Sequence, residues 1–173
     1  MKKFIIALIC ISAAISLCGC SENNNPAGNS DLVQDSGSSN DSGSETANAR
    51  ELAERALNAD EWPGMDFVTD QELVNALFSE KMVLEDFEDY ALVTNIISAT
   101  LNKVLVIKPK SDKADAVEAA MNEYYEYILN EGAFYPGQEA SVAGSVKGKT
   151  PSGYFYLIIH ENGAKIADKM LAG

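Results

Sequence analysis

The segment Ala91–Ile107, with the sequence ALVTNIISATLNKVLVI, decides the fold class of this chain. It holds two apolar runs rich in β-branched residues, Ala91–Ile97 and Lys103–Ile107, which are separated by a short polar connection near Asn102. Two such runs joined by a short turn predict an antiparallel β-hairpin. Pro109 closes the second strand, because proline has no backbone N–H to donate to a ladder.

A long amphipathic helix is predicted directly after this hairpin, from about Asp112 to Glu131. Its apolar side chains recur at helical spacing and form one stripe: Ala114, Val117, Met121, Tyr124 and Ile128, with Ala120 and Tyr125 widening it. Gly132 is suited to end the helix, since glycine is favoured just beyond helix C-termini. The pattern predicts a helix that packs one face on the sheet.

A second hairpin is predicted after this helix. Its strands are Ala140–Lys147, which alternates weakly, and Tyr154–Ile159, which is strongly hydrophobic, and its turn lies within Gly148–Gly153. A short amphipathic helix with Ile166, Met170 and Leu171 on its apolar side follows.

Two helices are predicted before the first hairpin. One spans Ala49–Ala59, where Asn48 and Glu51 form a capping pair, and the next starts at a capping-box pattern at Thr69. The order of elements predicts an α+β fold: an antiparallel four-stranded sheet (hairpin–helix–hairpin) with helices packed mainly on one face.

The N-terminal residues 1–19 have the pattern of an export signal. Lys2 and Lys3 supply positive charge, and the uncharged apolar run Phe4–Leu17 follows. A run of about 14 residues has the length of a signal-peptide core and is shorter than the roughly 20 that a spanning helix needs.

Leu17-Cys18-Gly19-Cys20 resembles the lipobox of bacterial lipoprotein signal peptides. This resemblance implies cleavage before Cys20 and a diacylglycerol lipid on its sulfur, with two acyl chains that hold stably to a membrane. The alternative is an ordinary secretory signal with an incidental cysteine. The lipobox interpretation predicts a lipid-anchored protein on the extracytoplasmic face of the cell membrane.

Composition divides the remainder into a tether and one domain. Residues 20–48 hold the lipidated cysteine and a linker rich in Ser, Asn, Gly and Asp, which cannot bury enough apolar surface to fold. Residues 49–173 have the size of a single globular domain. All three cysteines, Cys10, Cys18 and Cys20, lie in the signal or at its end. The domain therefore has no disulfide, thiolate metal site or cysteine nucleophile.

The charge balance excludes nucleic acid as a partner. Without Lys2 and Lys3 the chain has 26 acidic against 11 basic side chains, a net charge of −15. Between Arg50 and Tyr90 there are 12 acidic and three basic side chains. Such a surface has no basic stripe to displace counterions from phosphates.

No group of residues has the spacing of a catalytic or metal centre. His160, the only histidine, is predicted to be a polar residue at the end of a strand. The acidic run Glu85–Asp89 lacks the spacing of an EF-hand loop and is interpreted as a solvated face, with a weak divalent-ion site as the alternative. The chain is therefore expected to be non-enzymatic and to need no cofactor.

The tyrosines are the candidate binding residues. Tyr127 is predicted to point outward from the long helix, whereas Tyr124 belongs to its apolar stripe. Tyr154 and Tyr156 lie on the last strand. Exposed aromatic side chains can mark a partner surface, so Tyr127, Tyr154 and Tyr156 form the predicted binding set.

Four motifs carry a family resemblance: Glu85–Tyr90 (EDFEDY), Lys103–Ile107 (KVLVI), Tyr135-Pro136 with Gln138, and Gly153-Tyr154. With the signal and tether, the pattern from about Leu52 to Leu171 resembles a family of small lipoproteins from Gram-positive anaerobes, catalogued only as a domain of unknown function (number forty-three fifty-eight). The resemblance implies an extracytoplasmic lipoprotein and supplies no activity.

Three functions stay open from the sequence. The first is a non-enzymatic module that binds an envelope protein or a cell-wall component. The second is a small-ligand or divalent-cation binding accessory of an envelope transporter. The third is an enzyme, which would need paired carboxylates as its main groups.

Overall fold

In the computed structural model, which describes residues 47–95 and 99–173, five strands form one antiparallel sheet in the order β1-β2-β3-β5-β4. The strands are β1 (Met65–Val68), β2 (Phe87–Asn95), β3 (Lys103–Pro109), β4 (Val146–Lys149) and β5 (Phe155–Ile159). The helices are α1 (Ala49–Leu57), α2 (Gln71–Phe78), α3 (Ala114–Glu131), α4 (Gln138–Ala143) and α5 (Gly163–Ala172), and Leu84–Asp86 forms a 3₁₀ turn. The α+β class and the antiparallel sheet are confirmed.

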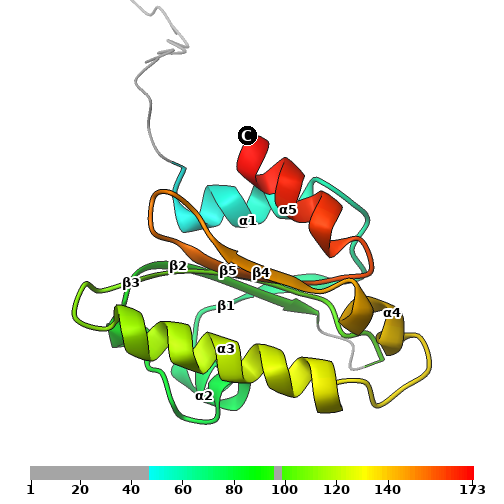
Figure 1. Ribbon diagram of the computed structural model, residues 1–173, viewed down its shortest axis with the longest axis horizontal. Helices are drawn as coiled ribbons and strands as arrows, with labels where there is room; N and C mark the ends of the chain where they lie inside the picture. Colours follow the sequence, from blue (N-terminus) through cyan, green and yellow to red (C-terminus); the bar gives the residue numbers. More distant parts are fainter. Residues whose placement is uncertain (1–46, 96–98) are drawn as a thin grey trace, which may run out of the picture. The chain divides into compact units, whose positions relative to one another are not determined.

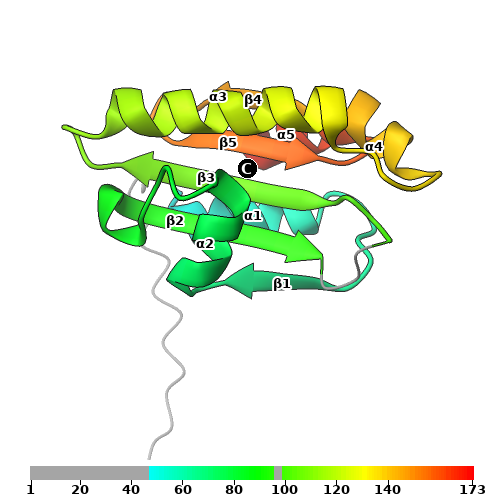
Figure 2. The same cartoon turned by 90° about the horizontal axis from the view of Figure 1, so that it is seen from below.

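The prediction of four strands is wrong, because β1 adds a fifth at one edge of the sheet (Figure 2). β1 pairs with β2, with Met65 opposite Asn95 and Val68 opposite Leu92. Its four residues are too few to show an alternation of polar and apolar side chains. The pairing with β2, rather than a local pattern, makes this segment a strand.

Helices cover both faces of the sheet, so the prediction that they pack mainly on one face is also wrong (Figure 1). α2, α3 and α4 lie on one face, and α1 and α5 lie on the other. Each face of the sheet has its own hydrophobic core: the first lies under α2 and α3, and the second lies under α1 and α5. Neighbouring residues of the central strands alternate between them, with Leu92 and Leu105 in the first core and Val93 and Val104 in the second. Strands buried on both sides read as continuous apolar runs, as these do.

α1 and α5 pack side by side on the second face. The predicted capping box of α1 is confirmed, because Asn48 accepts from the Glu51 N–H and Glu51 from the Asn48 N–H. On α5, Ile166 and Met170 are fully buried as predicted, whereas Leu171 is exposed. The first and last helices of the domain thus share one core.

The second predicted hairpin is wrong in its first strand. Residues 138–143 form α4, and the strand that pairs with β5 is the short β4 that follows it. α4 ends at Gly144, whose Cα lies against the loop that leads into α5. A Cβ on Gly144 would lie 2.2 Å from the Glu161 carbonyl oxygen, so this close approach requires glycine.

The predicted signal (residues 1–19) and most of the predicted tether, Cys20 included, lie outside the described residues. Between residues 47 and 173, apart from 96–98, no helix has both the length and the hydrophobicity needed to cross a bilayer.

Candidate functional site

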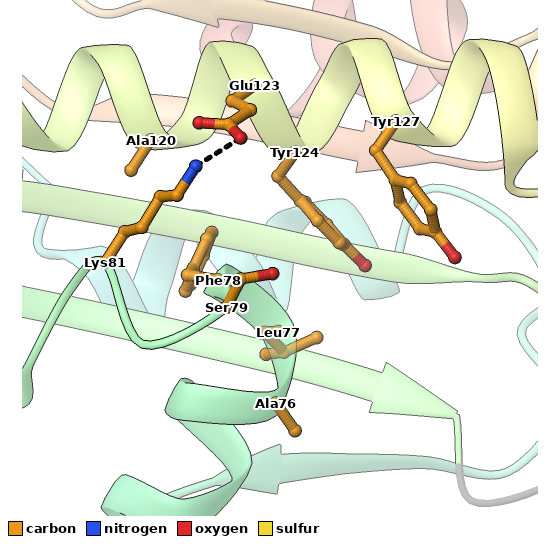
Figure 3. Close-up of a pocket in the computed structure, with 9 residues that line it drawn as sticks. All are labelled: Ala76, Leu77, Phe78, Ser79, Lys81, Ala120, Glu123, Tyr124 and Tyr127. Atoms are coloured by element: carbon orange, nitrogen blue, oxygen red, sulfur yellow. Dashed lines mark hydrogen bonds and ion pairs between the residues drawn. The ribbon is translucent and has the colours of Figure 1, made fainter.

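A cleft of about 340 Å³ lies between α2 and the middle of α3 (Figure 3). Both helices and the loop after α2 contribute its lining: Ala76, Leu77, Phe78, Ser79, Lys81, Ala120, Glu123, Tyr124 and Tyr127. We name this site the α2–α3 cleft.

α2 is fixed at its start and along its buried side. It begins one residue later than predicted, because Asp70 rather than Thr69 is the N-cap, and the Asp70 carboxylate accepts from the Leu73 N–H at 2.9 Å. Val74 and Phe78 are buried against the sheet. This packing leaves Leu77 only partly buried, on the side of α2 that faces α3.

The loop after α2 is held in an uncommon backbone conformation. Ser79 and Glu80 have φ values of 51° and 62°, which non-glycine residues seldom adopt. The Gln71 side chain holds the far end of the loop, since its oxygen accepts from the Leu84 N–H at 2.7 Å. The fixed loop places Ser79 and Lys81 at the mouth of the α2–α3 cleft.

Two tyrosines of α3 form the aromatic wall of this cleft. The Tyr124 and Tyr127 rings are stacked, with centroids 6.5 Å apart and planes 25° from parallel. Tyr124 also meets Phe78 edge to face, and burial raises its pKa above the ordinary tyrosine value, so its phenol stays neutral. Tyr127 is 44% exposed, in agreement with the prediction that it points outward. Its ring is available to a ligand.

The lining of the cleft contains one acidic and one basic side chain, and the two helices that form it are acidic. Lys81 and Glu123 form an ion pair across it (Figure 3). α2 and α3 together carry six acidic side chains and no basic one: Glu72, Asp115, Glu118, Glu123, Glu126 and Glu131.

The other two predicted binding tyrosines lie elsewhere. Tyr154 is 6% exposed in the second core, and its hydroxyl donates to Asp89 at 2.8 Å. Tyr156 is partly buried on the same face and covers Gly148 of the neighbouring strand. The structure therefore places Tyr127 apart from Tyr154 and Tyr156, and the three do not form one surface.

His160 follows β5 directly and is 5% exposed. Its ring lies 4.5 Å from the Trp62 ring, and its Nδ1 accepts from the Asn162 N–H at 3.0 Å. The neutral ring therefore carries its proton on Nε2, which lies 3.3 Å from the Glu61 carbonyl. With both nitrogens bonded, His160 acts as a structural residue at the strand end.

The acidic run Glu85–Asp89 does not converge on a point. Asp86 pairs with Lys113, Glu88 pairs with Lys108, and Asp89 accepts from the Ala49 N–H and from Tyr154. Lys113 lowers the pKa of the Asp86 carboxyl, mainly through their hydrogen bond. Within the described residues, no group of three or more His, Cys, Asp or Glu side chains could hold a metal ion.

Sequence reasoning identified Tyr127 but not the residues opposite it. Leu77 and Lys81 come from α2 and its loop, 50 and 46 residues earlier in the chain than Tyr127. The available signal was that α2 carries Leu73 and Leu77 in addition to the two apolar residues that pack on the sheet. Only the docking of α2 against α3 brings these residues together.

Comparison with known proteins gives one family. Residues 79–160 match the model described as Domain of unknown function (DUF4358). No curated protein and no solved structure matched the chain. The matched segment runs from the end of α2 to the end of β5 and includes α3 and α4. Residues 79–160 therefore match the DUF4358 family, the one that the resemblance in the sequence indicated.

Proposed function

We propose that this protein is a membrane-anchored, extracytoplasmic lipoprotein whose domain is a non-enzymatic binding module, with the α2–α3 cleft as its binding site. The observation that carries the binding function is the half-exposed Tyr127 ring beside a concave, partly apolar site. Concave sites with apolar walls and a few polar groups are the usual places for ligands. The uncommon backbone at Ser79 and Glu80 supports the same site, since such conformations gather at functional sites.

The lining favours binding over catalysis. Its two charged residues, Lys81 and Glu123, are exposed and form an ion pair with each other. Its phenol at Tyr124 is neutral and packed against Phe78. A catalytic site needs a nucleophile or base with a perturbed pKa in hydrogen-bond reach of a substrate, and these groups do not supply one.

A photocrosslinking amino acid at position 127 tests the cleft in intact cells. We expect a discrete crosslinked product, because a partner in the cleft would lie against this ring. The matched control is the same amino acid at Leu171, which is equally exposed (44%) but lies on α5, on the other face of the sheet. Equal products at both positions, or none at position 127, would contradict the proposal.

Replacing Cys20 by serine tests the anchor. We expect the C20S chain to leave the membrane fraction, because a chain with a net charge of −15 has no attraction for anionic lipid heads. Mass spectrometry of the mature N-terminus should find Cys20 with a diacylglycerol adduct in the unaltered protein. A C20S chain that stays bound to the membrane would refute a lipid anchor at this residue.

The second candidate is a small-ligand or divalent-cation binding accessory of an envelope transporter. The small-ligand version is favoured by a second cleft, of about 430 Å³, whose lining includes Lys103, Phe134 and Tyr135. For the cation version, the paired carboxylates of residues 85–89 lead us to expect no change in the thermal unfolding midpoint at millimolar calcium. An upward shift that saturates would revive the cation site.

A further inference from the structure

Lys103 is an inward-facing cation at the start of β3. It lies between Thr94 of β2 and Ile159 of β5, and its side chain is partly buried on the face that carries α3 and α4. Its ammonium group donates to the Thr94 hydroxyl at 2.6 Å. A hydroxyl dipole replaces little of the hydration that a buried ammonium loses.

No carboxylate accompanies this lysine in the part of the chain that the structure describes. Lys81, Lys108, Lys113 and Lys165 each form an ion pair with an acidic side chain. For Lys103, burial lowers the pKa to about 8, and no neighbouring charge offsets this effect. In a domain with so many acidic residues, a partly buried lysine without an acidic partner leaves a place for an external anion.

Lys103 lines a cleft of about 430 Å³. Seven residues line this Lys103 cleft: Asn95, Thr100, Leu101, Lys103, Phe134, Tyr135 and Gln138. All of them fall within residues 79–160, the segment that matches the family model. The α2–α3 cleft, in contrast, takes part of its lining from residues before that segment.

Two exposed aromatic side chains form the lip of the Lys103 cleft. Phe134 is 71% exposed and Tyr135 is 55% exposed, although both are large and mainly apolar. Their backbone is fixed, because the Gln138 side-chain oxygen accepts from the Phe134 N–H at 2.8 Å and from the Tyr135 N–H at 3.1 Å. Gln138 itself is only 3% exposed. A buried glutamine therefore holds the backbone of both aromatic residues at the cleft that Lys103 lines.

We propose that the Lys103 cleft binds a small amphipathic anion, with its carboxylate on the Lys103 ammonium and its apolar part against Phe134 and Tyr135. A carboxylate would give the ammonium the charge-assisted hydrogen bonds that the domain does not supply. An aromatic or aliphatic group on the same molecule would cover the exposed rings. The proposal shares no residue with the α2–α3 cleft, so the crosslinking result at position 127 does not decide it.

Anion binding and protonation of Lys103 are linked. The bound carboxylate favours the ammonium form, so it raises the pKa of Lys103 from its value of about 8. Affinity therefore falls above about pH 8, as the free lysine loses its proton, and also below about pH 4, where the ligand carboxylate becomes protonated. A neutral ligand of the same shape has neither effect.

The test is an NMR titration of the Lys103 side chain against pH, with N-acetyl-L-phenylalanine as the probe and its uncharged amide as the matched control ligand. We expect the acid to raise the titration midpoint of Lys103 and the amide to leave it unchanged. The missing resonance in the K103M variant assigns the signal. Equal midpoints with the acid and the amide would overturn the proposal.

Three variants separate the parts of the proposed site. K103M should weaken binding of the acid by about tenfold or more, to the level of the amide, while K103R keeps a preference for the acid. F134A should weaken both ligands alike. K110M, which removes an exposed lysine outside the cleft, is the control and should bind as the unaltered chain does. A K103M variant that retains the fold and binds the acid normally would refute the proposal.

Discussion

Substitution of Gly144 by alanine is expected to lower the free energy of unfolding by about 3 kcal/mol, a large share of the roughly 5–15 kcal/mol that stabilises a domain. The new Cβ would lie 2.2 Å from the Glu161 carbonyl oxygen and 2.5 Å from that of His160. Both obstacles are backbone atoms, which cannot move aside by a change of rotamer. Urea denaturation of the purified chain measures the effect.

Gly137→Ala is the matched control, because it isolates backbone strain from lack of space. Gly137 has a φ of 97°, which disfavours a side chain, but nothing lies within 4 Å of a Cβ there. Gly144 has an ordinary φ of −88° and no room. The control should cost about 1–2 kcal/mol. An equal or larger loss for the control would mean that the contact of Gly144 with the loop is not tight.

Replacement of Lys103 by methionine should have the opposite sign and raise the free energy of unfolding at pH 7. The lowering of the pKa from 10.5 to about 8 corresponds to a cost of up to ~3 kcal/mol for the ammonium form, at 1.36 kcal/mol per pKa unit. Because the side chain is only partly buried, we expect a gain of about 2 kcal/mol. Methionine retains the aliphatic stem and removes the charge.

The stability difference between K103M and the unaltered chain should depend on pH. Below pH 8 Lys103 is protonated in both the folded and the unfolded chain, so its cost is constant. Between pH 8 and 10.5 the folded chain releases the proton first, so the unfolded chain holds more protons and stability rises with pH. The difference between K103M and the unaltered chain should therefore shrink across this window.

Denaturation at pH 7 and at pH 9.5 measures that difference, with the exposed Lys110→Met as the control that should show none. A K103M variant that is less stable at pH 7 would show that the ammonium group stabilises the fold. The proposed anion site would then rest on the cleft and its exposed aromatic residues alone, without the energetic cost of an unpaired ammonium group.

The local elements of this fold were predictable where a single segment contains the whole signal. Asn48 and Glu51 predict the start of α1 because both partners of the capping box lie within one turn. α3 and the hairpin of β2 and β3 follow from long, regular runs. Residues 104–107 are a continuous apolar run, which indicates a strand with both faces buried. The prediction of helices mainly on one face of the sheet did not take this run into account.

The errors arose where distant contacts decide the structure. Ser141 and Val142 are acceptable in a strand or a helix, and the contacts that hold α4 are distant: Ser141 donates to Asn102, and Gly144 lies against the Glu161 carbonyl. The fifth strand exists because β2 extends far enough to pair with Met65–Val68. For the sites, the sequence marked Tyr127 but not Lys103, since a lysine at a strand start has no local feature that reveals burial.

The packing of α1 against α5 has a consequence for how the chain is made. The second core needs residues from both ends of the domain, Leu52 from the first helix and Met170 from the last. A nascent chain that emerges N-terminus first cannot complete this core until its final turn of helix is free, and contacts of such sequence separation form slowly. The second core, and the stability that it contributes, therefore forms only after the last helix has emerged, whereas the first core draws on residues 68–159 alone.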